Sequence, residues 1–334
     1  MGENKDILLD IKDLSVQFNT DSGVVKAVNH LNMKLERGKS LGFVGETGAG
    51  KTTTALSILQ LVQTPPGQIA SGEILFNGVD VCKMTETEKR RLRGGDISMI
   101  FQDPMTSLNP IMTVEDQIME MVSLHLKLKG GAVRDRAIEM LRLVGIRPER
   151  ARDFPHQFSG GMRQRVVIAI ALACRPQLII ADEPTTALDV TIQAQVLELI
   201  KKLQQSEKTS MLLITHDLGI VAETCDNVAI MYAGHLIEYA DLKSLYTAPK
   251  HPYTQGLFNA VPTLESPLGS RLAVIPGLPP DPTNLPKGCS FSPRCPYAKD
   301  LCYEKPCGMQ EVEAGHFVDC YFPLTPASGN AFLQ

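Results

Sequence analysis

The chain has 334 residues, a formal net charge of -4 and a pI near 6.0, with 43% hydrophobic and 21% charged residues. This length and composition are typical of a folded globular protein of about two domains. The acidic balance provides no bulk attraction to nucleic acid, so a nucleic-acid-binding function is disfavoured.

The apolar residues show no pattern for secretion or membrane insertion. The N-terminus, MGENKDILLD, has no basic region followed by an apolar run, so we expect no secretion signal and a cytoplasmic protein. The longest strongly apolar run, VVIAIALAC at 166–174, is about half of the roughly 20 residues needed to cross a bilayer. Any membrane association is therefore expected to depend on a partner.

Four short aliphatic runs alternate with helical patterns in the first 250 residues. Their lengths and lack of polar alternation are typical of strands covered on both faces, which predicts an α/β fold. The runs are SLGFV (40–44), DISMIF (96–101), LIIAD (178–182) and MLLIT (211–215).

The composition changes near residue 250, where we place a domain boundary. Of the 22 prolines, 14 lie in the last 86 residues. Stretches such as VIPGLPPDPTNLP (274–286) cannot sustain helices or central strands, because proline fixes φ and removes a donor. We expect a first domain over 1–250 and a small, irregular extension over 251–334 that needs a covalent or metal staple.

A strand, a glycine-rich loop and a helical pattern follow one another in SLGFVGETGAGKTTTALSIL (40–59). The segment 45–52 matches GxxxxGK followed by Thr in the context that a phosphate-binding loop requires. Loop N–H groups and the helix N-terminus bind phosphate, Lys51 bridges the terminal phosphates, and Thr52 can ligate Mg²⁺. The predicted nucleotide contacts are Gly45, Glu46, Thr47, Gly48, Ala49, Gly50, Lys51, Thr52 and Thr53.

Two further segments supply acidic and anion-binding groups. The run LIIADEPTTALD (178–189) ends a strand with Asp182, which can hold Mg²⁺ through water, and Glu183, which can polarise an attacking water. The segment FSGGMRQRVVIAIALACRP (158–176) opens a helix with Ser159, Gly160 and Gly161, which forms an anion site without its own lysine. In isolation these would be a surface Asp-Glu pair and a capped loop, but the phosphate loop favours the functional interpretation.

Together these motifs, with Gln102 in MIFQDP and His216 in LLITHD, resemble the ATP-binding-cassette (ABC) ATPases over about residues 8–240. The resemblance implies a P-loop α/β core of RecA type with a helical subdomain at about 103–175 and an antiparallel β-subdomain. It also implies that ATP and Mg²⁺ bind between two cassettes arranged head to tail.

The resemblance assigns further roles within that closed pair. Glu183, His216 and Gln102 are the catalytic residues, with Thr52, Gln102 and Asp182 around Mg²⁺. Ser159, Gly160 and Gly161 contact the partner's ATP, and Asp189 couples the two sites. Phe18, in the alternating run LSVQF, is expected either to stack on adenine or to pack in the core.

The segments QDPMTSLNP (102–110) and HPYTQGL (251–257), together with the cysteine-rich tail, resemble the ATPase subunits of dipeptide and oligopeptide permeases. This implies an ATP-hydrolysing subunit on the cytoplasmic face of the membrane. The expected partners are a second cassette, two membrane permease subunits and, indirectly, an extracytoplasmic binding protein. Import of nickel chelates or oligosaccharides is an alternative, and a soluble DNA-repair cassette is a further one.

Five of the eight cysteines lie within 32 residues, at 289, 295, 302, 307 and 320. A reducing compartment and the odd count argue against a disulfide framework. The permease resemblance predicts a 4Fe-4S cluster on Cys289, Cys295, Cys302 and Cys320, since soft thiolates suit it. Zn²⁺ on three or four cysteines, with His316 as a further ligand, and unliganded thiols are the alternatives, and Cys307 is a substitute ligand.

Overall fold

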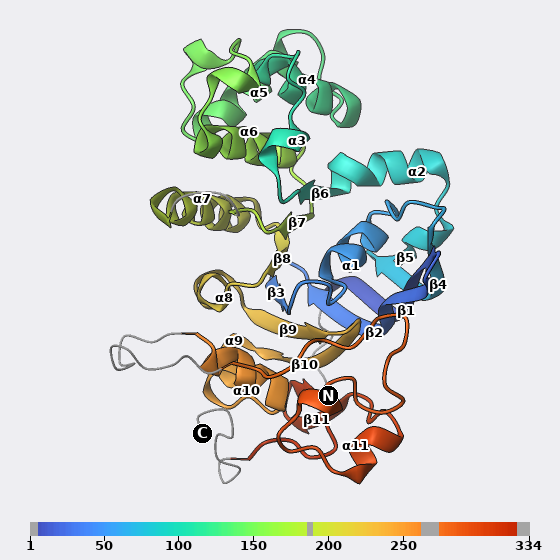
Figure 1. Cartoon of the computed structure of the whole chain (residues 1–334). Coiled ribbons are helices and arrows are strands. Elements are labelled where there is room, and N and C mark those ends of the chain that lie inside the picture. Colours follow the sequence, from blue (N-terminus) through green and yellow to red (C-terminus); the bar gives the residue numbers. More distant parts are fainter. Residues whose placement is uncertain (1–5, 186–189, 262–273, 326–334) are drawn as a thin grey trace.

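The computed structural model describes residues 6–185, 190–261 and 274–325. An eight-stranded sheet lies at its centre, in the order β11-β12-β10-β9-β3-β8-β7-β6 (Figure 1). The strands are β3 (Ser40–Val44), β6 (Ile97–Ile100), β7 (Leu178–Asp182), β8 (Ser210–Thr215), β9 (Asn227–Tyr232), β10 (His235–Asp241), β11 (Gln310–Glu313) and β12 (His316–Val318). The four aliphatic runs are thus confirmed as strands β3, β6, β7 and β8.

The middle of this sheet is parallel and buried on both faces. β3 pairs in parallel with β8 and β9, and β7 pairs in parallel with β6 and β8. Every residue of β3, β7 and β8 is buried, and neighbours such as Ile179 and Ile180 belong to different hydrophobic cores. Helix α1 (Lys51–Ile58) covers one face, and α7 (Val190–Glu207) and α8 (Leu218–Thr224) cover the other (Figure 1).

A second, antiparallel sheet of four strands packs on the α1 side, in the order β2-β1-β4-β5. Buried and exposed residues alternate from Leu31 to Leu35, as expected for a strand with one face on the core. The elements of this part are β1 (Ile7–Thr20), β2 (Gly23–Glu36), β4 (Gly67–Phe76), β5 (Val79–Asp80), η1 (Val81–Lys83), α2 (Glu86–Arg91) and η2 (Leu92–Asp96).

The chain between β6 and β7 forms a helical lobe, which stands at the top of Figure 1. It contains α3 (Pro104–Ser107), α4 (Val114–His125), α5 (Gly131–Leu143), η3 (Pro148–Arg150), η4 (Pro155–Gln157) and α6 (Gly160–Leu172). Thr113 caps α4 by accepting a hydrogen bond from Asp116 N at 3.2 Å. The lobe occupies the segment where the helical subdomain is predicted. Across the described ranges, no helix is both long and apolar enough to cross a bilayer.

The C-terminal segment is built onto the main sheet. It contains α9 (Leu242–Thr247), α10 (Pro252–Asn259), η5 (Ser292–Arg294) and α11 (Asp300–Glu304), and β12 pairs with β10 through Glu238–Val318 and Tyr239–Phe317. The rings of Tyr232, Tyr253 and Phe291 pack together with centroids 4.7 to 5.4 Å apart.

A separate, irregular cysteine-rich domain is therefore not confirmed. Residues 274–286 contain no helix or strand, as their prolines predict. The expectation fails further on, because 310–318 contains no proline and extends the sheet with β11 and β12.

Candidate nucleotide site

The topology brings the predicted site residues to one edge of the sheet. The phosphate loop follows β3, Gln102 lies just after β6, Glu183 follows β7 and His216 follows β8. Because these four strands are parallel neighbours, their carboxyl ends meet at the same edge, where α/β proteins bind their ligands.

The phosphate loop fits tightly against its surroundings. A Cβ on Gly45 would lie 2.3 Å from Met231 O, and a Cβ on Gly50 would lie 2.3 Å from Ala27 O. Gly50 also has φ 99°, a conformation that favours glycine, and it is the residue from which α1 starts. The loop is thereby fixed at the N-terminus of a helix, where free N–H groups and the helix dipole favour an anion.

Lys51 lies across the loop that precedes it. Its Nζ donates to Gly45 O at 2.7 Å and to Glu46 O at 2.9 Å. Burial lowers the pKa of Lys51, and the nearby carboxylates of Glu183 and Asp182 oppose that shift. A buried cation is thus held beside two acidic residues at the mouth of the loop.

Thr52 and Asp182, two of the predicted Mg²⁺ ligands, are in contact. Asp182 accepts a hydrogen bond from the Thr52 side chain, which lowers the pKa of the carboxyl but does not outweigh the larger effect of burial, so the pKa is raised. Asp182 is 5% exposed, whereas Thr52 is exposed. Two adjacent oxygen groups suit a hard cation.

Glu183 joins two of the other predicted residues. Gln102 Nε2 donates to Glu183 Oε2 at 2.7 Å, and His216 Nδ1 lies 3.0 Å from Glu183 Oε1. Glu183 has φ 45°, in the left-handed region that a non-glycine residue rarely adopts, and its N–H donates to Ile214 O at 2.8 Å. Such backbone strain is concentrated at functional sites.

The signature residues lie apart from this cluster. Ser159 caps α6, its Oγ accepting from Met162 N at 3.4 Å, and Ser159 and Gly160 are exposed. Gly161 packs against α7, because a Cβ there would lie 2.5 Å from Ile192 Cγ2. Figure 1 places α6 in the helical lobe and α1 in the lower body, so the two predicted anion sites are not brought together within the chain.

The last two predicted site residues are Phe18 and Asp189. Phe18 is half-buried in β1 and faces Gly67, whose added Cβ would lie 2.6 Å from its ring. Asp189, predicted to couple two sites, lies outside the described residues.

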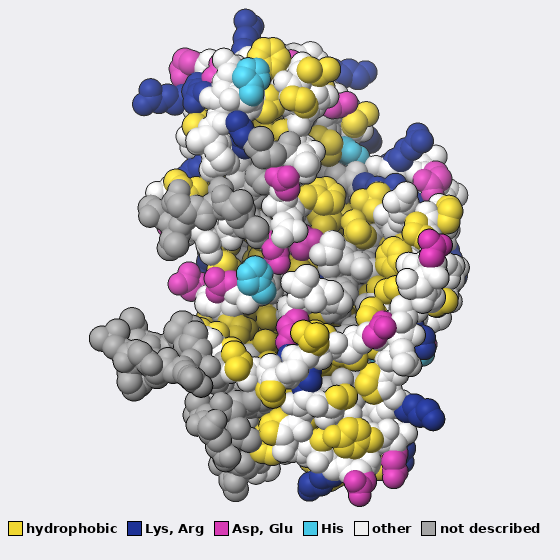
Figure 2. Space-filling view, viewed as in Figure 1, with side chains coloured by type: hydrophobic (Ala, Val, Ile, Leu, Met, Phe, Trp, Pro, Cys, Tyr) yellow, Lys and Arg dark blue, Asp and Glu magenta, His cyan; other side chains and the backbone are white. Residues whose placement is uncertain are grey.

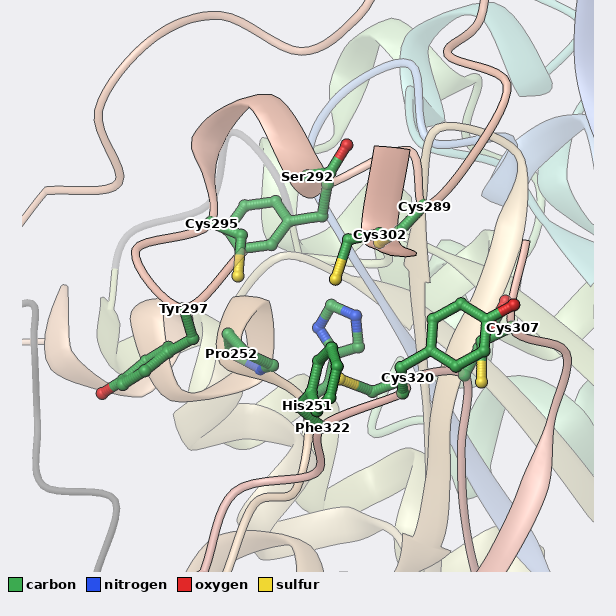
Figure 3. Close-up of a pocket in the computed structure, with 13 residues that line it drawn as sticks. His251, Pro252, Cys289, Ser292, Cys295, Tyr297, Cys302, Cys307, Cys320 and Phe322 are labelled. Carbon is green, nitrogen blue, oxygen red and sulfur yellow. The ribbon is translucent and has the colours of Figure 1, made fainter. Parts of the chain in front are cut away.

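The C-terminal cysteines line one small cavity of ≈ 20 Å³ (Figure 3). All four predicted ligands are there, as is Cys307. Figure 3 shows the sulfurs of Cys295 and Cys302 pointing into the space over the His251 ring. Burial raises the pKa of Cys289 and Cys320 to about 12, so these thiols are protonated at neutral pH.

One metal expectation needs correction, and the other has no support from the side-chain positions. His316, the extra zinc ligand, is absent from the cavity lining; its Nε2 instead lies 2.7 Å from Glu238 Oε1, and His251 is the histidine beside the cysteines. Among the residues that the structure places, no group of three or more Cys, His, Asp or Glu is arranged to hold a metal ion. The predicted 4Fe-4S ligand set is therefore not supported by the side-chain positions.

The sequence analysis missed two residues that contact the phosphate loop. Arg294 Nη1 lies 3.2 and 3.1 Å from the two carboxylate oxygens of Glu46, and Tyr253 OH accepts from Glu46 N at 3.1 Å. These residues are 248 and 207 positions from Glu46. Their only sequence signal is that they stand in the HPY and cysteine segments, which indicates nothing about a contact with the loop.

A buried lysine in a phosphate loop, beside the acidic pair at the end of β7, defines a P-loop nucleotide hydrolase. The family model for ABC transporters matches residues 28–186, and the model for the oligopeptide/dipeptide transporter C-terminal region matches 237–302.

Curated relatives match almost the whole chain. The oligopeptide transport ATP-binding protein OppD of Bacillus subtilis (strain 168) is 52% identical over 313 residues, covering 93% of this chain and 87% of that protein. The dipeptide transport ATP-binding protein DppD of Escherichia coli (strain K12) is 45% identical, covering 96% of this chain and 98% of that protein.

Solved structures agree on the fold over about 70% of the chain. The ATP-binding cassette MJ0796, in a dimeric post-hydrolysis state bound to ADP and Pi, matches 70% of this chain and 98% of its own at 25% identity and a TM-score of 0.63. The chain therefore belongs to the ABC-transporter ATP-binding proteins of the oligopeptide and dipeptide transport family, and it is an ATPase.

Proposed function

We propose that this chain hydrolyses ATP to energise the import of dipeptides or oligopeptides through separate membrane permease subunits. The observation that carries the ATPase role is the Glu183 carboxylate held between Gln102 and His216 at the edge of the sheet that carries the phosphate loop. The peptide cargo is supported by the named functions of relatives that match 93% or more of the chain.

In this proposal the loop N–H groups from Thr47 to Thr53 bind the ATP phosphates, and Lys51 leaves the Gly45 and Glu46 carbonyls to bridge them. Glu183 takes the proton of the attacking water, while His216 and Gln102 orient that carboxylate. Phe18 offers its ring to adenine from β1. Thr52, Asp182 and Gln102 would hold Mg²⁺, which neutralises phosphate charge when bound.

A second cassette completes the site. The exposed Ser159 hydroxyl and the adjacent glycines present an anion-binding helix end that is far from the phosphate loop of the same chain (Figure 1). A head-to-tail partner would bring that end to the ATP, with Asp189 coupling the two sites. The dimeric cassette among the structural matches supports this arrangement.

The membrane subunits would dock in a groove at the waist of the molecule, between the helical lobe and the lower body; we call it the waist groove. Figure 2 shows hydrophobic side chains gathered at this waist. The groove, of ≈ 300 Å³, contains the exposed Phe101, next to Gln102, and Leu61. An apolar helix from a permease subunit would cover these side chains, and Gln102 would connect that contact to Glu183. The chain would then lie peripherally on the cytoplasmic face.

The test is transport by the complex with its permease subunits in sealed vesicles. We expect ATP-dependent uptake of labelled di- or pentapeptides, and loss of that uptake with Glu183→Gln. Phe101→Asp should reduce co-purification with the permease subunits while ATP binding is retained. Uptake of a nickel chelate or oligosaccharide in place of peptides would refute the cargo, and duplex-DNA-stimulated hydrolysis without permease subunits would refute the transport role.

We also propose that Cys289, Cys295, Cys302 and Cys320 hold a 4Fe-4S cluster, with Cys307 as a spare thiol. The support is chemical: four thiols from separate segments line one cavity, and a cluster would cross-link them. Ligation requires loss of the thiol protons and opening of the small cavity. Anaerobic purification followed by iron and acid-labile sulfide analysis tests this, and zinc without iron would refute it.

A further inference from the structure

Glu46, the second residue of the phosphate loop, is held by the C-terminal segment at both its side chain and its backbone. Arg294 Nη1 contacts both carboxylate oxygens, at 3.2 and 3.1 Å, and Tyr253 OH accepts from Glu46 N at 3.1 Å. Both partners lie outside the matched ABC region 28–186. A nucleotide-binding loop is thus anchored by residues that are not part of the ABC match.

The Arg294 side chain is buried and makes several hydrogen bonds at this position. Its side chain is 7% exposed, against 28% for Glu46. Its other two nitrogens also donate, Nε to Pro276 O at 3.0 Å and Nη2 to Ile275 O at 3.3 Å, and Nη1 lies 3.1 Å from Tyr232 OH as well. A rigid, planar fork of donors is required for such a set, and the flexible point charge of lysine cannot reproduce it.

The same segment is also fixed to the other side of the loop. Pro282 O accepts from Lys26 N at 3.0 Å, and the next residue, Ala27, is the one whose carbonyl packs against Gly50. Residues 275–282 therefore run from Arg294, beside Glu46, to the strand that supports Gly50. The two ends of the glycine-rich loop are braced by one C-terminal segment.

This bracing reaches the phosphate-binding lysine. Lys51 Nζ donates to Gly45 O and Glu46 O, the carbonyls of the first two loop residues. A shift of Glu46 would move the groups on which Lys51 rests, and a loop that must reorganise before it binds loses affinity.

We propose that Arg294 is a positioning residue for ATP: by holding Glu46 and residues 275–276, it keeps the phosphate loop in its binding conformation. The inference rests on ATP binding at this loop, and it is independent of the cargo. Arg294 touches no part of the reaction, so its removal should weaken nucleotide binding and raise KM more than it lowers kcat. Arg294 directly precedes Cys295, one of the residues that line the cysteine cavity.

The experiment titrates the full-length chain with a fluorescent ATP analogue and Mg²⁺. We expect Arg294→Gln to weaken binding about tenfold, Arg294→Lys to weaken it less, and Glu46→Gln to weaken it in part. If the pair acts as a unit, the double variant should bind no more weakly than Arg294→Gln alone. Arg136→Gln is the matched control, because Arg136 is an equally buried arginine, 8% exposed, in the helical lobe.

The outcomes separate the two proposals. Failure of the unmodified chain to bind the analogue would refute the proposed function. Normal binding by Arg294→Gln, or a loss no larger than that of Arg136→Gln at equal thermal stability, would overturn the inference alone. Should Arg294→Gln fail to fold, Arg294→Lys decides, because it keeps the charge and removes the fork: affinity equal to the unmodified chain overturns the positioning role, and a loss supports it.

Discussion

The amide of Gln102 and the carboxylate of Glu183, 81 residues apart in sequence, meet in a 2.7 Å hydrogen bond at adjacent strand ends. Gln102 stands beside the exposed Phe101 of the waist groove, whereas Glu183 stands at the nucleotide edge. The bond therefore connects the proposed docking groove with the carboxylate proposed to activate water. Movement of the Gln102 segment would change how that carboxylate is oriented.

Glu183→Gln should nearly stop hydrolysis while ATP still binds. The amide keeps the size of the side chain but cannot accept the proton of water, and a general base contributes roughly 10²- to 10⁴-fold. Phosphate release under saturating MgATP measures the loss, and analogue titration measures the retained affinity. Turnover within a few-fold of the unmodified chain would assign the water-activating role to another group.

Gly50→Ala should damage the phosphate loop. The added Cβ would lie 2.3 Å from Ala27 O, and φ 99° is strained for alanine, so we expect a loss of about 1–3 kcal/mol in stability together with weaker nucleotide binding. Denaturant unfolding and analogue titration measure both. Gly131→Ala is the control, because no heavy atom lies within 4 Å of its added Cβ and alanine favours helix. Equal behaviour of the two variants would contradict the account.

The sequence predicts the parallel core and the catalytic edge because both depend on local patterns. A run such as LIIAD is short, aliphatic and followed at once by Glu183, so the same segment predicts both the strand and the site residue at its end. The C-terminal strands have no such signal: β11 is QEVE, with three exposed residues, and it forms only because β12 and β10 offer a sheet edge. The Arg294–Glu46 contact likewise could not be predicted from the sequence, since it depends on tertiary packing between residues 248 positions apart.

His235 should make the fold sensitive to mild acid. Burial, with smaller effects from His30 and Lys26, lowers the pKa of His235 to about 4, below the ordinary value of 6.5. The unfolded chain therefore takes up the proton first, so the stabilisation is complete above pH 6.5 and is lost as the pH falls towards 4, at about 1.4 kcal/mol per unit.

The comparison that checks this is the free energy of unfolding between pH 7.5 and 5 for the unmodified chain and for His235→Gln. We expect a flatter profile in the variant over that window. Parallel profiles for the unmodified chain and His235→Gln would show that His235 does not contribute.

Glu238 should prove essential for attaching the C-terminal strands. It is fully buried and accepts from Lys250 N, from His251 N at 2.9 Å, and lies 2.7 Å from His316 Nε2 in β12. Glu238→Gln replaces one acceptor oxygen by a donor that faces other donors, so we expect a loss of about 3 kcal/mol and faster proteolysis within 310–318. Glu198→Gln removes an exposed pair with Lys202 and should leave the free energy of unfolding nearly unchanged. If both variants unfolded at the same denaturant concentration, the buried carboxylate would not be what fixes β12 to β10.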